Sequence, residues 1–66
     1  MAKFTSLINT LIADDGGDAG LVLRNMIKAY LPHLEVTGQA TTLKEAFHMI
    51  TRLKPGLVFL DVQLED

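Results

Sequence analysis

The chain has 66 residues, of which 48% are apolar; it has no cysteine and a formal net charge of −2. A chain of this length forms one domain at most and typically buries only about 60% of the surface that its unfolded form exposes. Because the chain has no cysteine, disulfides and thiolate metal sites are excluded. The 6 basic residues are scattered along the sequence, so they form neither a nucleic-acid patch nor a polybasic membrane anchor. No stretch approaches the roughly 20 apolar residues of a membrane span. We therefore expect a soluble, cytoplasmic protein that does not bind nucleic acid directly.

The first half of the sequence predicts a strand and a helix. Residues 8–13 (INTLIA) are rich in β-formers and are followed by an Asp-Asp-Gly-Gly turn. From Asp18 onward the apolar residues recur with a helical period, so we expect Asp18 to be the N-cap and Pro32 to stop the helix. The predicted apolar stripe of this helix consists of Ala19, Val22, Leu23, Met26, Ile27 and Tyr30.

A second strand is predicted over residues 35–40 (EVTGQA). The alternation places Val36, Gly38 and Ala40 on one side, which is typical of a half-exposed edge strand.

A second helix and a third strand follow. Thr42 and Glu45 have the spacing of a capping box, in which each side chain satisfies the free backbone N–H of the other residue. The helix ends at a Lys-Pro-Gly turn, and residues 57–60 (LVFL) form a strand with no polar side. The predicted apolar stripe of this helix consists of Leu43, Ala46, Phe47, Ile50 and Leu53.

The polarity of the strands predicts the sheet. Strands separated by single helices pair in parallel with right-handed crossovers. Because the alternating strand belongs at an edge and the apolar strand in the interior, we predict an α/β fold, β-α-β-α-β, with strand order 2-1-3. The ends of the first and third strands then form a topological switch point, where such sheets bind ligands. Asp14, Asp15 and Asp61 all follow those two strands.

Three carboxylates at one edge of a sheet repel one another unless a cation neutralises them, and an oxygen-only site suits Mg²⁺. Asp61 follows four apolar residues of a buried strand, so it is the most rigidly held and the best candidate nucleophile for a phosphoryl group. The alternative, which stays open, is that Asp14, Asp15 and Asp61 are turn formers and helix caps.

Other features of the sequence carry weaker signals. Gly16, Gly17 and Gly20 would suit a phosphate at a helix N-terminus, but their spacing is not that of a dinucleotide-binding turn and no Walker lysine follows. His33 and His48 are expected to be solvated surface residues. Core packing, rather than recognition, is expected of Met26, Tyr30, Phe47 and Met49.

Two blocks of sequence, LIADD over residues 11–15 and KPGLVFLD over residues 54–61, together with the helix pattern between them, resemble the receiver domain of bacterial two-component response regulators. The resemblance runs from Ile8 onward and covers the first half of a receiver. It implies that residues 1–66 are a partial receiver domain, the first three strands and two helices of a flavodoxin-like doubly wound parallel sheet.

The resemblance also implies a site and a signalling role. Asp61 is then the phosphoacceptor and a Mg²⁺ ligand. Asp15 is a direct Mg²⁺ ligand, Asp14 a ligand through water, and the backbone carbonyl of Gln63 a third direct ligand. A histidine kinase supplies the phosphoryl group, and the parent protein passes the signal to an output domain, for which the KPGLVFLDVQLED ending favours a DNA-binding one. A phosphoacceptor of this kind is a signalling domain rather than an enzyme.

The chain departs from the receiver pattern in three places. Gly16 and Gly17 stand where receivers usually carry an acidic residue or proline, and Glu65 and Asp66 replace the usual Pro-Gly. The hydroxyl residue that ends the fourth strand of a receiver and the lysine that ends the fifth have no counterpart. We therefore do not expect stable phosphorylation of this chain by itself.

A second hypothesis, compatible with the first, is a truncated or engineered half-fold that forms a homodimer. Residues 57–60 are apolar on both faces yet would form an unprotected sheet edge if the chain ends at Asp66. Two copies joined through this strand would form a six-stranded sheet with twofold symmetry.

Overall fold

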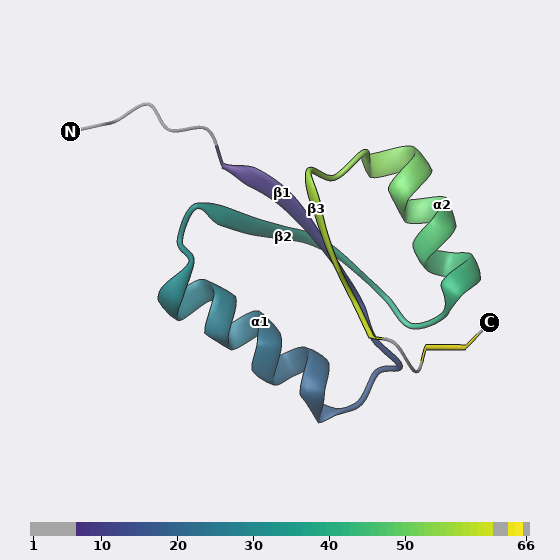
Figure 1. Ribbon diagram of the computed structural model, residues 1–66, viewed down its shortest axis with the longest axis horizontal. Helices are drawn as coiled ribbons and strands as arrows, with labels where there is room; N and C mark the ends of the chain where they lie inside the picture. Colours follow the sequence, from purple (N-terminus) through teal and green to yellow (C-terminus); the bar gives the residue numbers. More distant parts are fainter. Residues whose placement is uncertain (1–6, 62–63, 66) are drawn as a thin grey trace.

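The computed structural model describes residues 7–61 and 64–65. The three strands are parallel and lie in the order β2-β1-β3, with α1 on one face of the sheet and α2 on the other (Figure 1). The predicted α/β fold, half of a flavodoxin-like sheet with strand order 2-1-3, is confirmed. The elements are β1 (Ile8–Ala13), α1 (Asp18–Tyr30), β2 (Leu34–Ala40), α2 (Leu43–Leu53) and β3 (Leu57–Leu60).

The core follows the central strand, β1. Leu11, Ile12 and Ala13 are no more than 1% exposed, and they alternate between the two faces of the sheet. Leu11 lies on the α2 side, where it approaches Gly38 of β2. Ile12 lies on the α1 side, next to Leu23. Both helices are therefore held against the sheet through consecutive residues of β1.

Among the described residues, β3 pairs with β1 on one side and is an edge strand rather than an interior one. Its two faces are both apolar, as predicted: Val58 and Leu60 border α2, whereas Phe59 borders α1. All four residues of β3 are half-buried or exposed. The strand that occupies the interior of the described sheet is therefore β1.

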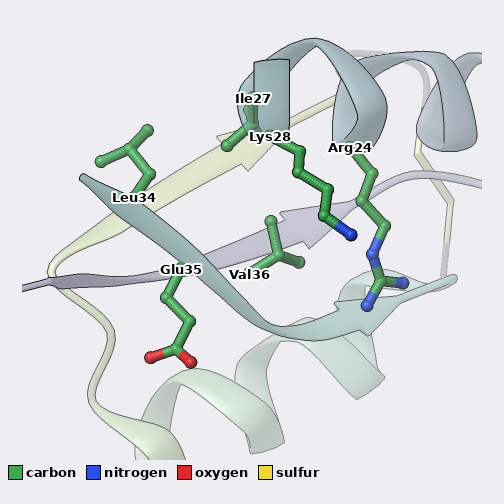
Figure 2. A pocket seen from close by; sticks show the side chains of 6 residues that line it. All are labelled: Arg24, Ile27, Lys28, Leu34, Glu35 and Val36. Atoms are coloured by element: carbon green, nitrogen blue, oxygen red, sulfur yellow. The ribbon is translucent and has the colours of Figure 1, made fainter. Parts of the chain in front are cut away.

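A β-bulge interrupts the pairing of β2 with β1. Thr10 pairs with Val36, but the next residue of β1 pairs with Gly38, so Thr37 is an extra residue. Val36 points toward α1 (Figure 2), whereas a Cβ at Gly38 would lie 3.0 Å from Cε of Met49 in α2. The prediction that Val36 and Gly38 share one side is wrong, because the extra residue shifts the alternation by one.

Most of the apolar stripe predicted for α1 is exposed. Ile27 is buried and Leu23 half-buried, but the exposed fractions of Val22, Met26 and Tyr30 are 54%, 52% and 75%. Leu23 lines an open hollow together with Phe59 of β3, so among the described residues this side of α1 is not packed against the sheet. The predicted packing of this stripe is therefore wrong for its outer members.

The stripe of α2 is likewise only partly covered. Ala46 is buried, Met49 packs against the buried cluster, and Leu53 is half-buried. Phe47, by contrast, is 68% exposed, so its predicted core role is wrong. The other exposed members of the predicted stripe are Leu43 and Ile50.

Both helix N-termini differ in detail from the prediction. Gly17 is the N-cap of α1 and forms no side-chain cap bond, so Asp18 is the first helical residue instead. At α2, Thr42 Oγ1 accepts the N–H of Glu45 at 3.0 Å, as predicted. The Glu45 carboxylate, however, accepts the N–H of Thr41 at 2.7 Å rather than that of Thr42. The N–H and then the hydroxyl of Thr41 lower the pKa of Glu45, so this bond persists in mildly acidic solution.

Candidate metal centre

The backbone brings the predicted acidic residues to one edge of the sheet. Asp14 and Asp15 follow β1, and Asp61 follows β3. Each of the two strand pairings continues by one backbone hydrogen bond beyond the strand ends. The N–H of Asp14 donates to the carbonyl of Ala40, and the N–H of Asp61 donates to the carbonyl of Ala13, both at 2.9 Å. Because parallel strands end at the same edge, these bonds fix Asp14 and Asp61 side by side.

The side chains of Asp14, Asp15 and Asp61 meet there. Each offers one carboxylate oxygen, and these three oxygens all lie within 4.8 Å of one another. Asp14 is buried, with 7% of its surface exposed, whereas Asp61 is half-buried and Asp15 is exposed. Hard oxygen donors at this spacing suit a divalent cation with some of its water retained. This acidic cluster can therefore hold a metal ion.

Asp14 and Asp15 also shape the turn that follows β1. Asp14 Oδ1 accepts the N–H of Gly16 at 3.1 Å, and Asp15 Oδ1 accepts the N–H of Gly17 at 3.2 Å. Gly16 has a φ of 93°, a conformation that side chains rarely allow. Asp14 and Asp15 therefore do stabilise this turn, as the alternative interpretation predicts. Each uses one carboxylate oxygen for the turn, and the second oxygen of each can still bind a cation.

Gly20 of α1 makes room for the cluster, a role that was not predicted from the sequence. A Cβ at Gly20 would lie 3.4 Å from Cβ and Cγ of Asp14 and 2.7 Å from Nε2 of Gln39. Glycine is unfavourable inside a helix. Its occurrence in the first turn of a predicted helix was therefore a usable signal of close approach.

Leu64 and Glu65 lie against the rest of the fold near the start of α2. The N–H of Leu64 donates to the Asp61 carbonyl, and the N–H of Leu43 donates to the Glu65 carbonyl, both at 3.0 Å. The side chain of Leu64 is buried, and the second bond holds Glu65 against the start of α2. Gln63, whose backbone carbonyl is a predicted ligand, lies outside the described residues. Leu64 packs in a cluster with Ala13, Ala40 and Ala46.

A hollow of about 460 Å³ opens beside two of the three carboxylates, between α1 and β3. Asp14 and Asp61 line it together with apolar side chains that include Leu23 and Phe59. A ligand on the acidic cluster therefore has space on the α1 side of β3. His33 and His48 are exposed and take no part in the cluster.

The described part of the chain contains no helix with both the length and the apolar character needed to cross a membrane.

Comparisons with known proteins give a distant similarity. The chain is similar to protein-glutamate methylesterase/protein-glutamine glutaminase 3 of Paramagnetospirillum magneticum, with 34% identity over 59 residues that make up 89% of this chain. The chain spans 16% of the length of that relative. No family model matches the chain, and no solved structure matches it. The fold and this similarity agree with a receiver-like domain of the kind that the sequence motifs resemble.

Proposed function

We propose that the chain is a partial receiver domain whose parent accepts a phosphoryl group on Asp61 from a histidine kinase and relays the signal to an output domain. The observation that carries this proposal is the meeting of the Asp14, Asp15 and Asp61 carboxylates within 4.8 Å at the switch point of a 2-1-3 sheet. The LIADD and KPGLVFLD blocks support the proposal, because they resemble the blocks in which receivers carry such aspartates.

In the proposed reaction a phosphoryl group is transferred from a phosphohistidine of the kinase to Asp61, so that one bond to phosphorus replaces another. A carboxylate oxygen of Asp61 attacks the phosphorus of a phosphohistidine whose other ring nitrogen carries a proton, the P–N bond breaks, and its electron pair stays on the imidazole nitrogen. The product is an aspartyl phosphate and a neutral histidine. The backbone bond to Ala13 holds Asp61 at the end of β3 during this attack. Mg²⁺, when bound, supplies charge neutralisation of the phosphoryl oxygens. Asp14, Asp15, Asp61 and the carbonyl of Gln63 are its proposed ligands.

The test uses the natural polypeptide that carries this sequence at its full length, incubated with acetyl phosphate and Mg²⁺. We expect an acid-stable, hydroxylamine-labile phosphoryl label that disappears in Asp61→Asn, because the amide has no nucleophilic oxygen anion. Asp18→Asn, a carboxylate on α1 outside the cluster, is the matched control and should keep the label. Equal labelling of Asp61→Asn, or no label on the parent polypeptide, contradicts the proposal.

As a second candidate we propose that this chain forms a homodimer through β3. Among the described residues the outer edge of β3 has no partner strand, and apolar side chains flank it on both layers: Phe47 and Leu60 on the α2 side, and Leu23 and Phe59 on the α1 side. Antiparallel pairing of two β3 strands would continue the sheet and cover these side chains under a twofold axis.

Light scattering coupled to gel filtration tests the homodimer directly. We expect twice the monomer mass at micromolar concentration, and the monomer mass for Leu60→Lys, because a lysine at this 56% exposed edge position would be desolvated in the dimer. Leu21→Lys, at a 58% exposed position of α1 that does not line the grooves beside β3, is the control and should stay dimeric. A monomeric parent chain excludes this candidate.

A further inference from the structure

The outer edge of β2 carries backbone groups that face away from the sheet. The first N–H of β1 donates to the carbonyl of His33 at 2.9 Å. Because alternate residues of a parallel strand bond the same neighbour, Glu35 also faces β1, whereas Leu34 and Val36 direct their backbone groups outward. The N–H of Leu34 donates to the carbonyl of Leu31 at 3.0 Å. Among residues 7–61 and 64–65, no backbone group pairs with the carbonyl of Leu34 or with either backbone group of Val36, which leaves them to a partner.

The bulge limits this edge to a short stretch. At Thr37 the regular pairing of β2 is interrupted, and bulged edges resist further strand addition because the local twist increases. A partner strand is therefore restricted to the segment before the bulge, at Leu34–Val36. This segment lies where β2 begins, at the opposite end of the sheet from the acidic cluster.

A cavity of about 220 Å³ lies between this edge and α1 (Figure 2). Leu34 and Val36 point toward α1, and Ile27 of α1 faces them, so the floor of the cavity is apolar. Ile27 is buried, whereas Leu34 and Val36 are half-buried. One side chain of a strand laid along β2 would meet this floor, since side chains of a strand alternate between its faces.

The rim of the cavity is positively charged. Arg24 and Lys28 lie one turn apart on α1 and extend over β2 (Figure 2). The Arg24 guanidinium donates to Oε1 of Gln39 at 3.4 Å, and within residues 7–61 and 64–65 neither cation forms an ion pair. Glu35 also lines the cavity, but its carboxylate points toward the α2 side of the sheet (Figure 2). It therefore leaves the two cations available to a partner.

We propose that this groove binds an extended acidic segment of another protein by strand addition to β2. The backbone of the segment pairs with Leu34 and Val36, an apolar side chain covers Ile27, and flanking carboxylates bind Arg24 and Lys28. Two cations are too few for a nucleic acid, whose binding depends on many phosphate contacts. The proposal is independent of the proposed phosphoryl transfer, because the groove and the acidic cluster lie at opposite ends of the sheet.

The test titrates the ¹⁵N-labelled chain with a blocked peptide of alternating glutamate and valine. We expect saturable binding that shifts the amide signals of Leu34–Val36 and weakens steeply as salt is raised. The double variant Arg24→Gln, Lys28→Gln should lose at least tenfold in affinity, since both charge-assisted contacts disappear. The double variant Lys44→Gln, Arg52→Gln makes the same charge change on exposed positions of α2 and should bind as the parent does.

Two further peptides separate strand addition from simple charge attraction. The same peptide with every second backbone nitrogen methylated keeps its charge but cannot donate to the edge, so it should also lose at least tenfold. A peptide of alternating lysine and valine should not bind. Equal binding of the methylated peptide or of the basic peptide overturns the proposal. It is also overturned if the parent chain does not bind the acidic peptide at millimolar concentration, or if it self-associates through Leu34–Val36.

Discussion

Asp14→Asn is expected to raise the stability of the chain in the absence of Mg²⁺ and to remove most of the stability that Mg²⁺ adds. Three carboxylate oxygens lie within 4.8 Å of one another, and Asp14 is the buried member of the set. Two such charges repel by about 1 kcal/mol in water and by several times that at the effective dielectric constant of a protein surface. Asparagine keeps the oxygen that accepts the Gly16 N–H, so the charge is the main change.

The expected changes in stability, with and without Mg²⁺, can be estimated from the same carboxylate contacts. Without a cation, relief of repulsion should stabilise the fold by about 1 kcal/mol, or about 4–8 °C in Tm for a chain of this size. With Mg²⁺ at 100 times its dissociation constant, a bound ion adds about 2.7 kcal/mol to the parent. The variant should lose most of this gain, because the cluster keeps two carboxylates instead of three. Thermal unfolding followed by circular dichroism, in EDTA and in excess MgCl₂, measures both effects.

Asp18→Asn supplies the control with the opposite sign. Asp18 is a carboxylate in the first turn of α1 and lies outside the cluster. Its negative charge therefore interacts favourably with the positive end of the helix dipole and stabilises the fold. Its removal should lower stability slightly and leave the Mg²⁺ response unchanged. If Asp14→Asn lowers stability in EDTA, or if it responds to Mg²⁺ as the parent does, the three carboxylates do not form a cation site.

The sequence was sufficient for the sheet and for the position of the carboxylates. The apolar run Leu57–Leu60 and the polar residues of β2 favoured the order 2-1-3, and the structure has this order, with β2 at an edge as predicted and β1 rather than β3 in the interior of the described sheet. Once the order is known, the ends of β1 and β3 must meet, and Asp14 and Asp61 come together without further information. Placement of these residues depends on strand polarity and chain connection, which are readable from one sequence.

The sequence was insufficient wherever the outcome depended on contacts between distant segments. The bulge at Thr37 lets Gly38 face Met49 and Leu11. The position of this bulge depends on packing and cannot be predicted from the local pattern of residues. The spacing of apolar residues predicted an apolar face on α1. It did not show how much of this face a three-stranded sheet can cover, so the exposure of Tyr30 was not predicted. The burial of Leu64 depends on its contacts with Ala13, Ala40 and Ala46, which are equally distant in the sequence.

Leu11→Ala is expected to be the most destabilising single truncation in the chain. Leu11 is completely buried on the central strand. Its Cδ1 would lie 3.2 Å from a Cβ at Gly38, next to Met49 and Leu53 of α2, so the side chain fills the space between β1, β2 and that helix. Loss of a buried leucine side chain costs about 2–5 kcal/mol, through lost transfer energy and the cavity left behind.

That cost approaches the whole stability of a fold of this size. At roughly 0.05–0.15 kcal/mol per residue, the chain of 66 residues has a few kcal/mol in total, and Leu11→Ala should leave a substantial unfolded fraction in water at 25 °C. Urea unfolding followed by circular dichroism measures the difference against Leu21→Ala, at a 58% exposed position of α1, which should stay within about 0.5 kcal/mol of the parent. If the two variants are equally stable, Leu11 does not fill the space between β1 and α2. The attachment of α2 to the sheet would then depend on other contacts, chiefly the cluster around Leu64.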